Sequence, residues 1–221
     1  ESRGDHSGAE IITTAHRPNE TIRSPDKLRD DTQKLNILFQ LAGELNGLNG
    51  LDEILQKISD ATFQAFSPAN FFAVTLIEDP ESLDSNTSIE PFFQAARRSR
   101  GSQAGKTNLS TELLRRVIET RENLLFVKDS LGPDASKSII DAGIEASMCA
   151  PLVGQKRLLG TIQVDTRGRG GAFTKADLNL FSVLASHAAF SIERAKLSEN
   201  ITEIFEQFVE ASVGAVEARD Q

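Results

Sequence analysis

The sequence predicts an α+β fold, in which an antiparallel sheet is flanked by helices and long helices stand before and after it. Strand-like runs are neighbours along the chain, and the turn Gly154-Gln155-Lys156 joins two of them, 147–153 and 157–166, as a hairpin. Helical patterns form separate runs and do not alternate with these strands. That order argues against a doubly wound parallel sheet.

The composition sets outer limits on function. Apolar residues make up 39% of the 221 residues and include 13 Phe, enough for a packed core. The net charge of −8 and a pI near 5.0 disfavour binding to nucleic acid or to anionic membranes. No apolar run approaches the roughly 20 residues that a transmembrane helix needs. A single Cys excludes an internal disulfide and, without a signal-peptide pattern, favours a cytoplasmic location.

Four segments follow from changes in composition and period. Residues 1–24 are polar and lack a hydrophobic period, so we expect a flexible linker. Residues 25–48 are expected to form an N-terminal dimer helix. Residues 49–197 are expected to form the main domain, and residues 198–221 to continue as a coiled-coil linker helix into a further domain. The heptad seam of the N-terminal helix consists of Leu28, Leu35, Leu38, Ala42 and Leu45.

Hydrophobic period and turn residues mark the elements of the main domain. The segment 128–143 has the pattern of a loop with one weak helical turn at 136–140. The Gly-rich segment 166–172 and the N-terminal tail are expected to be mobile. The expected helices are 51 to about 67 and 108–120, and the expected strands are 70–77, 91–96, 124–127, 147–153 and 157–166.

A long helix is expected from Lys175 to about Asp220, because this stretch has no Pro and a single Gly, Gly214. Thr174 is the expected N-cap, with Asp177 as its capping-box partner. At 1.5 Å per residue such a helix spans roughly 70 Å, more than a compact domain needs for its own core. It is therefore expected to meet a partner chain or to reach another domain. Its heptad seam consists of Leu197, Ile201, Ile204, Phe208, Ala211 and Ala215.

Several motifs in the second half of the chain together resemble a GAF domain. They are a Gly-Ile step, a strand ending in Pro-Leu, a Leu-Gly-x-Ile strand, a Phe-Thr-x-x-Asp helix start and an Ala-rich helix. The residues are Gly143-Ile144, Ser147–Leu152, Leu159–Asp165, Phe173–Leu178 and Ala185–Ala195. The resemblance covers about 34–197 and implies a sensory module that binds a small molecule and signals through its flanking helices.

The same resemblance places the two heptad seams where GAF proteins have their dimer helices. We therefore expect a parallel homodimer built as a four-helix bundle, which needs shallow crossing angles between the helices. The N-terminal seam would face the long helix of the same or the partner chain. The interface residues would be Leu35, Leu38, Ala42, Leu45, Ala185, Ala188, Ile192, Ala195, Ile201, Ile204 and Phe208.

A ligand pocket is also implied, between the sheet and the segment that joins the short strand to the Pro-Leu strand. The residues that map to it are Asp129, Ile139, Ile144, Met148 and Gln163. A buried Gln163 would need a hydrogen-bond partner, which a ligand could supply. The alternative is that the Phe-rich core fills this space and Gln163 faces solvent. Cyclic-nucleotide binding is in doubt, since Arg167, Gly168 and Arg169 replace the family's signature, and the ligand or cofactor stays unknown.

No catalytic or metal residues are predicted for this chain. Three scattered His and one Cys do not form a zinc set, and no nucleophile has a recognisable base near it. Residues 101–107 are one residue short of a phosphate-binding loop. Cys149 lies in an expected core strand, where a small buried apolar role is the ordinary one.

The end of the long helix resembles a second family. Phe208–Asp220 is similar to the first helix of HD-GYP domains, which are metal-dependent phosphodiesterases of cyclic di-GMP. The resemblance implies such an output domain after this segment, with its metal ligands beyond Gln221. A coiled-coil linker into a cyclase or kinase domain is the alternative. For the main domain, the alternative to a sensor is a dimerisation spacer without a ligand.

Overall fold

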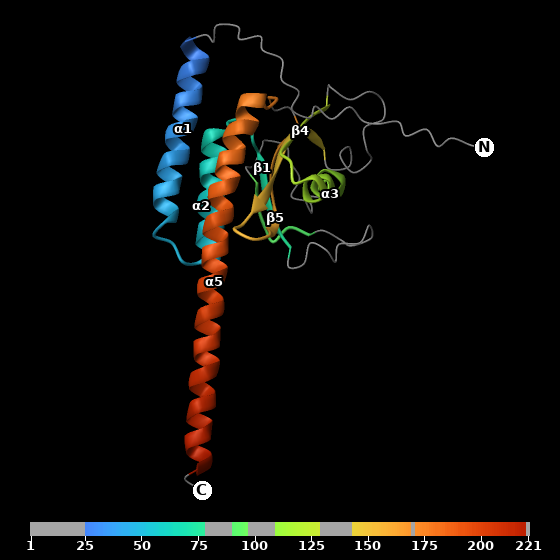
Figure 1. The fold of residues 1–221 in the computed structure, drawn as a ribbon. Coiled ribbons are helices and arrows are strands. Elements are labelled where there is room, and N and C mark those ends of the chain that lie inside the picture. The colour runs from blue at the N-terminus through green and yellow to red at the C-terminus, as the bar shows by residue number, and fades with distance from the viewer. Residues whose placement is uncertain (1–24, 78–89, 97–108, 129–142, 169–170, 220–221) are drawn as a thin grey trace, which may run out of the picture.

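The computed structural model describes residues 25–77, 90–96, 109–128, 143–168 and 171–219. Five antiparallel strands form one sheet; α2 and α5 cover one face, α1 lies outside these two helices, and α3 covers the other face (Figure 1). The elements are α1 (Pro25–Leu45), α2 (Leu51–Ala65), β1 (Phe71–Leu76), β2 (Phe93–Ala96), α3 (Thr111–Thr120), β3 (Leu124–Val127), β4 (Ile144–Val153), β5 (Leu158–Arg167) and α5 (Lys175–Arg219).

The α+β prediction is confirmed, and each expected helix and strand in the described residues is present within a few positions of its expected bounds. The hairpin turn is also confirmed, because the Gly154 N–H donates to the Arg157 carbonyl at 2.9 Å. The expected linker 1–24 and the expected helical turn at 136–140 lie outside the described residues.

The sheet has the strand order β2-β1-β5-β4-β3, and its two faces bury different cores. We call them the α5 face and the α3 face after the helices that cover them. The core of the α5 face includes Phe72, Val74, Met148, Val164, Phe181 and Ile192, together with the inner side of α1. The core of the α3 face consists of Phe71, Ala73, Leu109, Leu113, Leu114, Val117, Leu124, Phe126, Ile144 and Cys149.

A β-bulge at the start of β4 changes which face its residues occupy. Ile144 pairs with Arg167, whereas Ala146 pairs with Thr166, so one residue of β4 is left over at position 145. Because alternation shifts by one at the bulge, Ile144 joins the α3 face while Ala146 and Met148 join the α5 face. Ile144 and Met148 are four positions apart and would share a face of a regular strand, but here they point to opposite faces of the sheet.

The long helix α5 has two halves with different surroundings. Its first half packs Phe181, Ala185, Ala188 and Ile192 into the core of the α5 face. From Leu197 to Ser212 every described side chain is exposed, and this half projects from the domain as a free rod (Figure 1). None of the helices in the described residues has both the length and the hydropathy of a membrane-spanning segment.

Candidate functional site

A polar row runs along β5 on the α3 face, in the middle of the sheet. Gln163 Nε2 donates to Asp165 Oδ1 at 2.7 Å, and Arg167 donates to Asp165 Oδ2 through Nε at 3.1 Å and Nη2 at 2.7 Å. Gln163 and Asp165 are almost completely buried. Residues two apart on a strand share a face, which is why sequence spacing alone brings these three side chains together. We call them the polar ladder.

The Arg167 end of the polar ladder is fixed by two further contacts. Its guanidinium carbon lies 3.7 Å from the centre of the Phe71 ring. Its backbone N–H donates to Asn70 Oδ1 at 2.9 Å, and Asn70 Nδ2 donates to its carbonyl at 2.7 Å. Stacking on an aromatic ring and pairing with a carboxylate suit the planar guanidinium. Arg167 thus closes one end of the site and neutralises Asp165.

Three buried polar atoms on this face have no hydrogen-bond partner. Among the described residues these atoms are Ser147 Oγ, Thr161 Oγ1 and Gln163 Oε1. Ser147 pairs across the strands with Asp165, so both lie on the α3 face with Gln163 and Thr161. An unpartnered buried polar atom costs roughly 1–3 kcal/mol, and native proteins satisfy almost all of them. Three such atoms on one face mark the place where a polar molecule would stabilise the domain.

The structure brings together part of the predicted pocket and separates the rest. Ile144 and Gln163 share the α3 face, as the prediction required. Met148 was placed there wrongly: it is fully buried on the α5 face, opposite Val164, because of the bulge in β4. Gln163 is 1% exposed, so the alternative that it faces solvent is also wrong. Asp129 and Ile139 lie outside the described residues.

Cys149 lies beside Gln163 on the neighbouring strand and is fully buried. Burial, and after it the negative charge of Asp165, raises the pKa of the thiol far above its usual range. The group is therefore a neutral thiol at physiological pH, which confirms the prediction of a small buried apolar residue. Over the described residues, no three or more His, Cys, Asp or Glu side chains are grouped as metal ligands.

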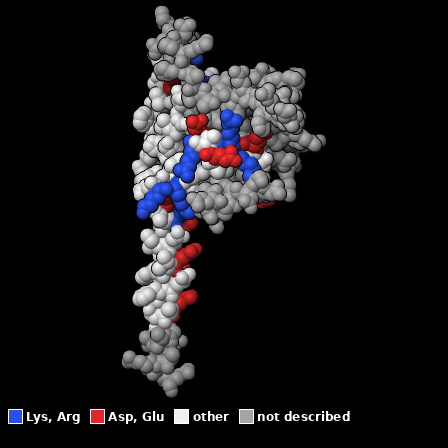
Figure 2. All heavy atoms as spheres, turned by 45° about the vertical axis from the view of Figure 1, so that its right-hand side comes forward, with Lys and Arg blue, Asp and Glu red and all other residues white. Residues whose placement is uncertain are grey.

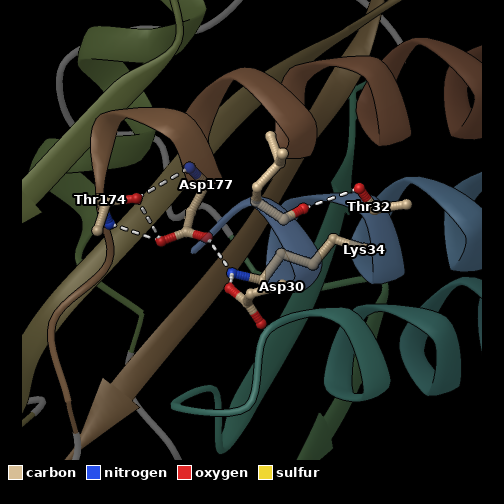
Figure 3. A network of polar contacts seen from close by, with 6 residues as sticks. Asp30, Thr32, Lys34, Thr174 and Asp177 are labelled. Atoms are coloured by element: carbon tan, nitrogen blue, oxygen red, sulfur yellow. Dashed lines mark hydrogen bonds and ion pairs between the residues drawn. The ribbon is translucent and has the colours of Figure 1, made fainter. Parts of the chain in front are cut away.

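Helix α1 is tied to the beginning of α5 by an ion pair (Figure 3). Lys34 Nζ lies 2.8 Å from Asp177 Oδ1, and it also contacts the more exposed Asp30. Asp177 Oδ2 accepts from the Thr174 N–H at 2.8 Å and from its hydroxyl at 2.7 Å, and Thr174 Oγ1 accepts from the Asp177 N–H. The predicted capping box is thereby confirmed, with Lys34 added from a distant helix.

The two charges of this pair shift each other's pKa. Burial opposes ionisation of Asp177, but the hydrogen bonds from Lys34 and Thr174 outweigh it and lower the pKa of the carboxyl. Burial likewise opposes the charged form of Lys34, and the bonds to Asp177 and Asp30 outweigh it and raise the pKa of the amine. Both groups are therefore charged across the neutral range, and the pair holds α1 against α5.

A second tie joins α5 to the C-terminal end of α1. Arg194 donates to the carbonyls of Leu45 at 2.7 Å, Asn46 at 2.9 Å and Leu48 at 2.8 Å. These carbonyls lie at and just after the C-terminus of α1, where backbone acceptors lack helical partners and a cation is favoured. Sequence reasoning missed Arg194, since its partners are about 150 residues earlier in the chain and no local pattern marks them.

The β4–β5 hairpin is attached to α5 by a third tie. Glu193 Oε2 accepts from the backbone N–H of Gln155 at 2.9 Å. A Cβ at Gly154 would lie only 2.7–2.9 Å from the same carboxylate, so glycine permits this close approach. Next to this contact is a surface hollow of about 430 Å³, where α5 leaves the domain. Its lining residues are Arg157, Leu159, Glu193, Lys196, Leu197, Glu199 and Asn200.

Two exposed apolar stripes remain on α1 and α5. The stripe of α1 is formed by Leu28, Leu35 and Phe39, the last of which is 75% exposed. The stripe of α5 follows heptad spacing from the domain to the rod, and its members are Val183, Phe190, Leu197, Ile201, Ile204 and Phe208. Exposed apolar stripes of this length are typical of interaction surfaces.

The predicted interface residues fall into two groups. Leu35, Ile201, Ile204 and Phe208 are exposed, and Ala42 is partly buried on the outer part of α1. Within one chain, the others are already buried, so they have no free surface for a second copy. These residues are Leu38, Leu45, Ala185, Ala188, Ile192 and Ala195. Their small or branched side chains let α5 and α1 pack closely on the sheet and on α2.

Charge is distributed differently on the domain and on the rod. On the face shown in Figure 2, blue and red side chains mix over the domain, whereas the described part of the rod shows only red. Residues 197–212 contain Glu199, Glu203, Glu206 and Glu210 and no Lys or Arg. In the heptad that puts Ile201 and Phe208 at a, these Glu residues occupy c and f, away from the stripe.

The sequence matches the family model of the GAF domain over residues 49–193. No curated protein shows significant similarity to the chain. Among solved structures, it is similar to the GAF domain of a phosphoenolpyruvate-protein phosphotransferase from Coxiella burnetii. The TM-score is 0.57 at 20% identity, covering 77% of this chain and 98% of that one.

Two further solved structures show the same fold. A GAF domain from the Acinetobacter phosphoenolpyruvate-protein phosphotransferase has a TM-score of 0.55 at 14% identity, covering 76% of this chain and 97% of that one. Free methionine-R-sulfoxide reductase from Neisseria meningitidis, solved with its substrate, has a TM-score of 0.57 at 12% identity. The match covers 76% of this chain and 93% of that one. The family match spans more than half of the sequence, and the chain belongs to the GAF domain family.

Proposed function

We propose that this chain senses a small molecule on the α3 face and passes the signal through α5 to an output domain. A GAF domain is a regulatory module. The observation that carries the proposal is the continuity of α5, which packs on the sheet in its first half and projects from the domain in its second. A change in the sheet that shifts the first half must move the rod as well, because the helix is unbroken.

The route from the α3 face to α5 passes through the β4–β5 hairpin. The unpartnered atoms of Ser147, Thr161 and Gln163 lie on these two strands, and Glu193 holds their turn against α5. A ligand that shifts β5 relative to β4 would therefore pull on α5 a few residues before it leaves the domain. For that shift to be regulatory, the ligand must bind the two states with affinities that differ, typically by 1–3 kcal/mol.

The proposed partner of the exposed stripes is a second copy of this chain, in parallel orientation. The positions that flank the α5 stripe carry Ser198, Asn200, Phe205 and Gln207, so two copies meet without like charges at the e and g positions. The acidic side chains at c and f stay in solvent. Phe39 and Leu35 of α1 extend the apolar surface, as a four-helix bundle requires.

The proposed output domain is a cyclic di-GMP phosphodiesterase of HD-GYP type. Support comes from the resemblance of Phe208–Asp220 to the first helix of such domains, and from the helix reaching Arg219 without interruption. A cyclase or kinase domain after a plain coiled-coil linker is the alternative. A protein that carries this output domain would be an enzyme, and this chain would be its regulatory part.

Insertions into the rod of the longer protein test the transmission. Two residues inserted after Ser198 rotate the following helix by about 200°, and four rotate it by about 40° modulo a turn. We expect cyclic di-GMP hydrolysis to be altered strongly by the two-residue insertion and little by the four-residue one. Equal activity in the parent and in both variants would contradict transmission through the rod. Hydrolysis absent from the parent protein itself would contradict the proposed output domain alone.

A further inference from the structure

The amide of Gln163 has a fixed orientation in the α3 face. One end of the amide lies 2.7 Å from Asp165 Oδ1. A carboxylate only accepts hydrogen bonds, so the amide nitrogen must be the end that faces Asp165. Gln163 Oε1 consequently points away from Asp165, and it is buried without a partner. The site therefore presents one oriented acceptor.

The rest of the polar ladder holds that acceptor in place. Asp165 cannot turn away from Gln163, because its other oxygen accepts two hydrogen bonds from Arg167. Arg167 is held in turn by Asn70 through the backbone and by the Phe71 ring. A group fixed by its neighbours loses little conformational freedom when a ligand binds, which favours affinity.

The neighbours of Gln163 on both adjacent strands are small. Ala73 pairs with it from β1 and Cys149 from β4, so no large side chain stands directly beside the acceptor on the sheet. The unpartnered hydroxyl of Thr161 lies two residues away on the same strand and face. The unpartnered Ser147 hydroxyl lies on the other side, opposite Asp165. A molecule over Gln163 would meet three polar atoms that need partners.

The described part of this face carries no uncompensated charge. Arg167 and Asp165 neutralise each other, and Cys149 is a neutral thiol. An anion placed here would lose its hydration without gaining an opposite charge, which is costly in a buried site. A neutral molecule avoids that cost.

We propose that the α3 face binds an uncharged small molecule that donates an N–H or O–H hydrogen bond to Gln163 Oε1. This inference rests on the proposed sensor function and names the ligand class of its site. Thr161 and Ser147 take the ligand's other polar groups, because a hydroxyl can either donate or accept. Ligands with a negative phosphate or carboxylate are rejected, which sets this site apart from a cyclic-nucleotide site.

Calorimetric titration with matched pairs of neutral and charged probes tests the proposed class of ligand. Adenosine and nicotinamide are uncharged donors, and cyclic AMP and nicotinate carry the same ring systems with a negative charge. We expect at least one uncharged probe to bind, and its charged counterpart to bind at least tenfold more weakly. A charged probe that binds as tightly as its neutral counterpart, or no binding by either neutral probe at millimolar concentration, would overturn the proposal.

Two variants show whether the named atoms make the contact. Thr161→Val keeps the shape and removes an unpartnered hydroxyl, so the ligand-free protein should melt at the same or a higher temperature while affinity for the neutral probe falls. Gln163→Met should weaken binding about tenfold or more. The control is Gln56→Met, since Gln56 makes the same kind of bond to Asp60 at the exposed surface. Unchanged affinity in both variants would refute the contact.

Failure of the proposed ligand class can be distinguished from failure of the proposed sensor function. A dimer that forms and transmits a signal but binds no neutral probe would refute the ligand class alone. Binding of a neutral probe by a chain that stays monomeric would refute the dimeric sensor and leave the ligand class standing.

Discussion

Gly160 shows how one residue can be required by the sheet. It has φ +151°, and a Cβ at this position would lie 1.8 Å from the carbonyl oxygen of Thr75 on β1. That oxygen belongs to the backbone of the central strand pair and cannot move aside without breaking the ladder. The Leu-Gly-x-Ile motif noticed in the sequence therefore has a steric cause.

Substitution of Gly160 should lower the free energy of unfolding strongly, in contrast to substitution of a glycine that has free space around its would-be Cβ. We expect Gly160→Ala to destabilise the domain by more than about 3 kcal/mol, from overpacking and lost strand pairing. Gly143→Ala should cost only about 1–2 kcal/mol, because Gly143 has φ +64° but nothing within 4 Å of its would-be Cβ. Urea unfolding monitored by circular dichroism measures both, and equal losses would show that the contact with Thr75 is not the cause.

Asp177 is the residue on which the pairing of α1 with α5 should depend. Asp177→Asn removes the charge that faces Lys34 and the start of α5, and we expect a loss of about 1–3 kcal/mol. Asp30→Asn is the matched control: Asp30 contacts the same Lys34 but is mostly exposed, so its loss should stay below about 0.5 kcal/mol. Equal effects would mean that burial does not strengthen the Asp177 contact.

The pH dependence of this effect follows from the two pKa shifts. The pKa of Asp177 is lowered below 3.8 in the folded state, so its contribution is complete above that value and is lost as pH falls through the lowered pKa. The pKa of Lys34 is raised above 10.5, so its contribution is complete below 10.5 and is lost as pH rises further. The stability difference between wild type and Asp177→Asn should thus be constant between about pH 5 and 10 and shrink outside that window.

At the scale of elements, Glu193 joins the hairpin to α5 through one hydrogen bond. We expect Glu193→Ala to speed hydrogen exchange at the Gln155 amide by about tenfold, as loss of roughly 1.4 kcal/mol implies, with little change in global stability. Glu199→Ala is the control, since Glu199 lines the same hollow nearly two turns further along α5. Unchanged exchange at Gln155 in the Glu193 variant would show that the hairpin is held by other contacts.

The exposed stripe of α5 should decide the oligomeric state. Ile204→Glu places a charge in the middle of the stripe, where a dimer would have to bury it, and we expect the dissociation constant to rise at least a hundredfold. Thr202→Glu adds the same charge at a b position outside the stripe and should leave association nearly unchanged. Sedimentation of both variants measures this, and equal behaviour would exclude the stripe as the contact.

Most helices and strands could be predicted from the sequence, because the periodicity of apolar residues and the turn residues are local signals. It was harder to predict which side of α5 stays exposed. The exposed stripe through Leu197 and Ile201 continues back to Phe190 and Val183, whereas Ala185 and Ala188 were predicted from the sequence to lie in the dimer interface. Both rows repeat at heptad spacing, and only packing shows which one faces the sheet. The error for Met148 has another origin, since a bulge changes the alternation of β4 without a mark in the sequence.

The candidate site could be predicted only in part, because some of its features are local in the sequence and others are not. Gln163 stood out as a polar residue in an apolar strand, which sequence can show. Its bond to Asp165 and the salt bridge to Arg167 agree with their spacing of two along β5, but the sequence does not show that this face of the strand is buried. The ties made by Arg194 and Glu193 join segments far apart in the chain, and no local signal marks them.

On the scale of the whole molecule, the three ties give α5 a central place. The Lys34–Asp177 pair fixes the middle of α1 to it, Arg194 fixes the C-terminal end of α1, and Glu193 fixes the β4–β5 hairpin. Helix α5 is thus in contact with both the incoming helix and the sheet before it leaves as the rod. We propose that the rods of two such chains lie parallel and in register along their exposed stripes.

Disulfide cross-linking of single-cysteine variants tests this claim most directly. Cys149 is fully buried, so a new exposed Cys is the reactive one. In a parallel dimer the two copies of an a-position residue lie within the span of a disulfide, so Ile201→Cys should form a covalent dimer of twice the 24.1 kDa chain mass on mild oxidation. Glu203→Cys, at an outer c position, should remain a monomer under denaturing electrophoresis. Equal cross-linking of the two variants, or none by Ile201→Cys, would contradict a parallel, in-register dimer.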